Sequence, residues 1–142
     1  MLSIDTNILL YAQNADCTEH RRAYEFVTTC ADREDVAICE LVLVELCLLL
    51  RNPAVVSRPL ASHAAVRVCR SYRLNPRWRV SENAPVMEEV WRCAAEGNFA
   101  RRRIVDARLA LTLRHHGVTE LATANVKDFA GFGFDRVWDP VA

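Results

Sequence analysis

The stretch MLSIDTNILLYAQ (residues 1–13) joins a short apolar strand to the start of a helix, with an acidic residue between them. Residues 1–5 are predicted to form the strand, and the helix begins at about residue 7. Asp5 stands at the junction, where a helix cap is one explanation, because an aspartate there accepts hydrogen bonds from free backbone N–H groups. Whether capping is enough depends on where the other acidic residues lie.

The same alternation of strands and helices continues along the chain. Strands are predicted at residues 36–39, 78–81, 119–123 and 134–138, and helices at 18–30, 40–50, 62–72, 84–96 and 101–116. Thr18 is the expected cap of the first of these helices, and Gly117 ends the last. This order predicts an α/β fold with a mostly parallel central sheet of four to five strands and helices on both faces. In such sheets, ligands bind beyond the carboxyl ends of the strands.

The composition is that of an ordinary globular protein, with 51% hydrophobic and 25% charged residues among 142. We expect a single domain over residues 1–142. The apolar run at residues 41–50 contains Glu45 and is shorter than the roughly 18 to 20 residues that span a bilayer. The N-terminus does not resemble a signal peptide, and the six cysteines show neither zinc-site nor disulfide spacing. A cytoplasmic protein with free thiols and no membrane contact is therefore expected.

The formal net charge is zero, with 18 basic and 18 acidic residues. Any surface that binds nucleic acid must therefore be local rather than a property of the whole chain. The triplet Arg101, Arg102 and Arg103 is one such local cluster. It either contacts nucleic acid or forms a solvated helix face.

Two predicted helices carry an acidic residue on the face that should be buried. The residues at helical spacing are apolar: Leu41, Val42, Leu48 and Leu49 around Glu45, and Leu109, Ala110 and Leu113 after Asp106. A buried carboxylate is costly unless it is paired, neutralised or bound to a cation. One explanation is an ion pair, for example of Asp106 with Arg102 or Arg103. The other is that both acids belong to one site with Asp5.

A fourth segment, LATANVKDF (residues 121–129), has polar residues directly after a predicted strand. Thr123 ends the strand, and Asn125 and Asp128 follow in a loop, where they form a turn or complete an oxygen-rich cluster. Carboxylates that converge raise one another's pKa values, and a divalent cation such as Mg²⁺ or Mn²⁺ relieves their repulsion. Such a cluster suits the hydrolysis of a phosphodiester by activated water.

The ordered set of Asp5-Thr6-Asn7, Glu45, Asp106 and TANVKDF (residues 123–129) resembles the PIN-domain ribonucleases. More narrowly, it is similar to the VapC-type toxins of bacterial toxin–antitoxin pairs. Two further stretches, VELCLLLRNPAV (residues 44–55) and DFAGFGFDRVWDP (residues 128–140), are similar to members of that group. The resemblance covers essentially the whole chain and implies a PIN-like α/β/α sandwich.

The resemblance also implies which residues form the site. Asp5, Glu45 and Asp106 would be the three carboxylates that hold Mg²⁺ or Mn²⁺. Asn125 matches the fourth position of the family, which is acidic in many relatives, and Asp128 lies close by as a further contributor. The residues that would orient these acids or contact phosphate are Thr6, Asn7 and Thr123.

The activity implied by the resemblance is metal-dependent endoribonuclease cleavage, with an RNA such as tRNA or rRNA as the substrate. Arg101, Arg102 and Arg103 would then grip the RNA backbone. The partners implied are a cognate antitoxin protein and a second copy of the chain in a homodimer. The apolar surface of the helix at residues 40–50, which extends beyond one face, is consistent with a protein partner.

Two other functions remain open at the level of sequence. One is a catalytically silent PIN-like module that binds RNA or protein, because Asn125 is an amide where many relatives have an acid. The other is an enzyme that forms an aspartyl phosphate, because Asp5 ends a first strand. That chemistry usually needs a second acid two residues later, and Asn7 stands there instead.

Overall fold

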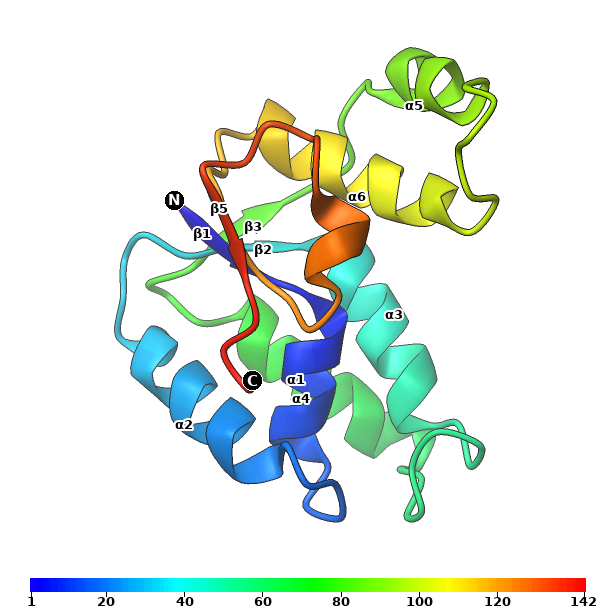
Figure 1. Ribbon diagram of the computed structural model, residues 1–142. Coiled ribbons are helices and arrows are strands. Elements are labelled where there is room, and N and C mark those ends of the chain that lie inside the picture. Colours follow the sequence, from blue (N-terminus) through cyan, green and yellow to red (C-terminus); the bar gives the residue numbers. More distant parts are fainter.

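The structure is a computed structural model that describes residues 1–142 (Figure 1). The strands are β1 (Leu2–Ile4), β2 (Ala37–Cys39), β3 (Arg79–Ser81), β4 (Glu120–Ala122) and β5 (Arg136–Trp138). The helices are α1 (Thr6–Gln13), α2 (His20–Ala31), α3 (Glu40–Leu50), α4 (Ser62–Arg73), α5 (Met87–Ala94), α6 (Arg103–His115) and the short 3₁₀ helix η1 (Val126–Phe129).

All strand pairs are parallel. One ladder has the order β1-β4-β5 and the other pairs β2 with β3. A parallel bridge between Leu2 and Val36 joins the two ladders, so that the five strands follow the order β3-β2-β1-β4-β5. The predicted parallel sheet of four to five strands is therefore confirmed.

Helices cover the sheet from two sides. In the view of Figure 1, α5 and α6 lie above the strands, whereas α1, α2 and α4 lie below them. The core is a cluster of 28 buried hydrophobic residues, among which Phe129 of η1 and Leu113 of α6 are fully enclosed. None of the helices has both the length and the apolar character needed to cross a membrane.

Two details of the helices differ from the prediction. The prediction of Thr18 as a helix cap is wrong, because α2 begins at His20 and its cap residue Glu19 makes no side-chain capping bond. A 3₁₀ helix, η1, forms within the segment predicted as a loop after β4. Gly117 does follow the last residues of α6, with a φ of 82° that glycine adopts without strain.

The placement of Glu45 on a buried stripe is also wrong. Helix α3 buries Val42, Leu43, Leu46 and Leu50, whereas Glu45 is exposed, as are Val44 and Leu48 beside it. The reason is that α3 is apolar on nearly every side, so that spacing alone cannot tell which apolar face enters the core. Asp106 is only partly buried, although Leu109, Ala110 and Leu113 are buried as expected.

Candidate active site

The parallel register of β1 and β4 brings two polar residues together at the carboxyl edge of the sheet. Ile4 lies opposite Ala122, and the Asp5 backbone N–H donates to the Ala122 carbonyl at 2.9 Å. Asp5 directly follows β1 and Thr123 directly follows β4, so the two residues lie next to each other. Both are buried, Asp5 with 6% of its surface exposed.

The Asp5 carboxylate is fixed by three donors. Thr123 Oγ1 donates to Oδ2 at 2.6 Å, Asn7 Nδ2 donates to the same oxygen at 3.3 Å, and the Thr6 backbone N–H donates to Oδ1 at 2.8 Å. The bond from Thr6 caps α1, and a helix cap is one of the roles that the sequence predicted for Asp5. Capping uses only one of the two carboxylate oxygens, so it does not account for the contacts to the second.

Thr6 and Asn7 connect Asp5 to the neighbouring segments. Thr6 Oγ1 donates to Glu45 Oε2 at 3.0 Å, which ties the first turn of α1 to α3. Asn7 Oδ1 accepts a bond from the Ala124 backbone N–H at 3.2 Å, and Thr123 Oγ1 accepts one from the Asn125 N–H at 3.0 Å. The three supporting residues predicted from the sequence thus form one hydrogen-bonded network around Asp5.

A pocket of about 280 Å³ opens over this network between α1, α3 and α6. Asp5, Glu45, Asp106 and Asn125 line it, together with Thr6 and Asn7. Its other wall is apolar and formed by Leu10, Leu41, Val42, Val44, Leu48, Leu49, Val105 and Leu109. Residues that are far apart in the sequence therefore meet in one pocket at the carboxyl edge of the sheet.

The electrostatics of the pocket are those of crowded acids. Burial is the main cause that raises the pKa of Asp5, and the charges of Glu45 and Asp128 add to it, while the bonds from Thr123 and Thr6 oppose it. Burial likewise raises the pKa of Asp106 to about 6, with the charges of Asp128, Asp5 and Glu45 adding to the effect. A bound cation stabilises carboxylates that are crowded in this way, because its positive charge offsets their mutual repulsion.

The alternative of ion pairs with arginine is wrong for these acids. None of the six ion pairs in the structure includes Asp5, Glu45, Asp106 or Asp128. Arg103 lies near Asp106, but its guanidinium donates to the carbonyl oxygens of Asp128 and Ala130, at 3.2 and 2.9 Å. No arginine therefore forms an ion pair with these acids, although the charge of Arg103 acts to lower the pKa of Asp106.

Asn125 and Asp128 occupy different places relative to the pocket. Asn125 is exposed and lines it, as the residue that caps η1. Asp128 is half-buried on η1 and outside the lining, yet among the charged groups it has the largest effect on the pKa of Asp106. Both residues are thus close to the three carboxylates.

The oxygen-rich side of the pocket fits a hard divalent cation, because its three acidic residues offer carboxylates and its other polar groups there are amides and a hydroxyl. As the side chains stand, no three acidic, histidine or cysteine groups converge closely enough to enclose an ion. The carboxylates line the walls of the pocket instead.

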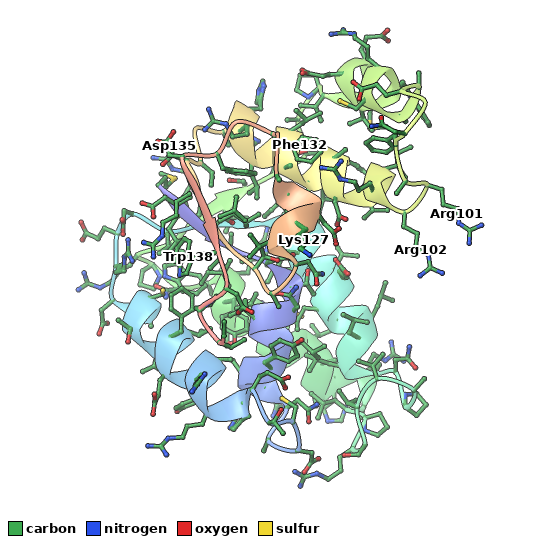
Figure 2. All side chains as sticks on the ribbon, in the orientation of Figure 1. Arg101, Arg102, Lys127, Phe132, Asp135 and Trp138 are labelled. Atoms are coloured by element: carbon green, nitrogen blue, oxygen red, sulfur yellow. The ribbon has the colours of Figure 1, made fainter.

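The arginine triplet is divided by the structure. Arg101 and Arg102 are exposed and extend away from the body of the molecule in Figure 2, ahead of the first turn of α6. Arg103 is engaged with backbone carbonyls and lies over the rings of Phe99 and Phe132. Its guanidinium therefore holds η1 against α6 rather than facing solvent.

Sequence reasoning missed one basic residue of the pocket, Arg108 of α6. It is one of many arginines, and no motif distinguishes it. The sequence does indicate that Arg108 lies on the same side of a helix as Val105 and Leu109, and this spacing could have pointed to it.

Comparisons with known proteins agree with this architecture. The family model of the PIN domain matches residues 2–134. The chain is 64% identical over 141 residues to the ribonuclease VapC24 of Mycobacterium tuberculosis, a match that covers 99% of this chain and 97% of that protein.

Two solved structures share the fold at low sequence identity. VapC20 of Mycobacterium tuberculosis, described as a Sarcin-Ricin loop cleaving toxin, has a TM-score of 0.71 at 21% identity, over 94% of this chain and 96% of its own. FitAcB from Neisseria gonorrhoeae has a TM-score of 0.66 at 17% identity, over 99% of this chain and 98% of its own. These two structures have the same fold as this chain. The family model and the 64% identity to VapC24 show that the chain belongs to the PIN-domain family and, within it, to the VapC ribonucleases.

Proposed function

We propose that the chain is a divalent-metal-dependent endoribonuclease that uses Mg²⁺ or Mn²⁺ to hydrolyse RNA phosphodiester bonds. The proposal rests on three carboxylates that line one pocket: Asp5 between β1 and α1, Glu45 of α3 and Asp106 of α6. None of them forms an ion pair with a basic side chain. The name of the 64% identical relative, a ribonuclease, supports the same activity.

Asp5, Glu45 and Asp106 are the residues that would hold the ion. The ion would supply an activated water and offset negative charge on the phosphate. Thr123 and Thr6 position the oxygens of Asp5 and Glu45 through the bonds of 2.6 and 3.0 Å. Oδ1 of Asp5 accepts a single hydrogen bond, and the bond from Thr6 engages only Oε2 of Glu45, so each carboxylate keeps a lone pair available for the ion.

Asn125 and Asp128 are proposed to support the three carboxylates. The Asn125 amide lines the pocket and can orient a water or a phosphate oxygen without adding charge. Asp128 adds negative charge beside Asp106 and so strengthens the attraction of the site for a cation. Arg101 and Arg102, exposed and free of ion pairs, are available to RNA beyond the pocket.

The same proposal includes the role of a toxin that is held by a cognate antitoxin protein and forms a homodimer. Exposed apolar residues beside the pocket support a protein partner: Val44, Leu48 and Val105 have 60%, 66% and 66% of their surface exposed. Structural neighbours include a VapBC2 complex from Rickettsia felis bound to a promoter DNA fragment. A cytoplasmic location belongs to the proposal because tRNA and rRNA are found there.

The proposal is tested by incubating a mixed pool of bacterial tRNA and rRNA with the purified chain in Mg²⁺, in Mn²⁺ and in EDTA. We expect discrete fragments with a 5′-phosphate and a 3′-hydroxyl only when metal is present, and none with Asp106→Asn. A folded protein that cleaves nothing in either metal, yet binds the RNA equally in EDTA, would instead support a silent RNA-binding module.

A further inference from the structure

Arg108 is the one basic residue among the fifteen that line the pocket. Its side chain is exposed and takes part in none of the six ion pairs, even though acids line the same pocket. Its one side-chain hydrogen bond is long, 3.5 Å from Nη2 to Asn83 Oδ1 in the segment between β3 and α5. Arg108 therefore brings a guanidinium with free donors to the edge of a pocket whose other charged residues are all acidic.

The helix fixes where this guanidinium lies relative to the acids. Residues two positions apart on a helix point in directions about 200° apart, so Arg108 and Asp106 lie on different sides of α6. Val105 and Leu109 fall between them and line the pocket there. Val105 and Leu109 thus form an apolar strip on α6 that separates Arg108 from Asp106.

We infer that Arg108 binds a phosphate of the RNA strand next to the one that is cleaved. The guanidinium offers paired N–H donors that match phosphate oxygens, and its charge offsets the repulsion between RNA and the acids of the pocket. The strip of Val105 and Leu109 then faces the nucleotide between the two phosphates. This inference rests on the proposed ribonuclease function and adds to it the contact that sets the position of the strand.

A purely structural role is the competing explanation for Arg108. In that case its bond to Asn83 would anchor the segment between β3 and α5 against α6. The two explanations differ in what Asn83→Ala does. If anchoring matters, Asn83→Ala has the same effect as Arg108→Ala, whereas phosphate binding leaves Asn83→Ala like the wild type.

The first test is binding of a fluorescein-labelled single-stranded RNA of mixed sequence, in EDTA so that no cleavage occurs, across a salt series. The proteins are the wild type, Arg108→Ala, Arg108→Lys and Asn83→Ala, with Arg92→Ala as a control that removes the same charge from exposed α5. Arg108→Ala should weaken binding about tenfold at low salt. It should also reduce the slope of log affinity against log salt by about 0.7.

Arg108→Lys should keep the slope, because the charge remains, and Asn83→Ala and Arg92→Ala should keep both slope and affinity. Wild-type affinity and slope for Arg108→Ala would overturn the inference. So would an equal loss in Asn83→Ala, which would make Arg108 an anchor of the loop.

The second test measures cleavage against RNA concentration. A contact to a neighbouring phosphate is present before and during the reaction, so Arg108→Ala should raise KM and leave kcat nearly unchanged. A fall in kcat at constant KM would contradict a contact outside the reacting phosphate. Failure of the ribonuclease proposal is separate, because it shows as a wild type that cleaves nothing in either metal, whatever the binding series gives.

Discussion

Thr123 donates a 2.6 Å hydrogen bond to Oδ2 of Asp5, across 118 positions of the sequence. Parallel pairing of β1 with β4 places the two residues side by side, since each directly follows its strand at the same edge of the sheet. The bond fixes one oxygen of the most buried acid in the pocket and lowers a pKa that burial raises. The sheet therefore presets the position of the first carboxylate.

Replacing Thr123 by valine should remove this bond while keeping the shape of the side chain. Without the hydroxyl, the Asp5 carboxylate loses a hydrogen-bond donor and the Asn125 N–H loses its acceptor. This loss should lower the free energy of unfolding by about 1 to 3 kcal/mol. Cleavage should fall by at least about tenfold, as is usual for residues that orient metal ligands. Thr123→Ser keeps the hydroxyl and should retain most of the activity. Urea unfolding and initial cleavage rates measure the two effects.

Asp106→Asn should stabilise the metal-free protein at neutral pH. The pKa of Asp106 is raised from 3.8 to about 6 in the folded protein. Asp106 therefore contributes its full share to the free energy of unfolding below pH 3.8, and this contribution is lost as the pH rises through 6. The asparagine carries no charge to crowd its neighbours. The gain should be about 1 kcal/mol at about pH 7, reduced by solvent screening, and near zero at about pH 4. Urea unfolding in EDTA at both pH values measures it, and an equal gain at both would contradict the pKa assignment.

Mg²⁺ or Mn²⁺ should raise the thermal midpoint of the wild type, because an ion that binds only the folded state stabilises it. At saturating metal we expect a rise of about 5 °C, measured by calorimetry against EDTA. Asp5→Asn should lose the rise. Asp135→Asn is the matched control, because Asp135 is exposed, outside the pocket lining and at the opposite side of the view in Figure 2 from Arg101. Equal shifts in both variants would place metal binding elsewhere.

Asp128→Asn should lower the pKa of Asp106 below its value of about 6, because the charge of Asp128 is the largest of those that raise it. Carboxyl carbon chemical shifts followed by NMR through a pH titration report that pKa directly. Asp139→Asn serves as the comparison, since Asp139 is not among the groups that affect Asp106. An unchanged Asp106 pKa in Asp128→Asn would show that Asp128 lies too far away to support the site.

The fold could be predicted from the sequence because its signals are local. Strand and helix patterns, Gly117 after α6 and the acid at the end of β1 each depend on a few neighbouring residues. The fourth segment also lies where it was expected, with Thr123 bonded to Asp5 and Asn125 in the pocket.

The environment of Glu45 could not be predicted in the same way. An apolar neighbourhood on a helix predicts burial, but α3 turns one apolar face to the core and another, with Val44 and Leu48, to the pocket. The ion pairs considered for Asp106 failed for a related reason, since Arg103 has the right spacing but is held by the carbonyls of η1. Which partner a long side chain chooses depends on segments distant in the sequence.

In the proposed site, Asp5, Glu45 and Asp106 together hold the ion required for RNA cleavage. The decisive measurement is the cleavage rate of one mapped RNA site against Mn²⁺ concentration for the wild type, Asp5→Asn, Glu45→Gln and Asp106→Asn. We predict that each amide raises the half-saturating Mn²⁺ concentration by at least about tenfold and lowers the maximal rate. A variant that keeps the metal dependence and the maximal rate of the wild type would show that its carboxylate is not part of the site.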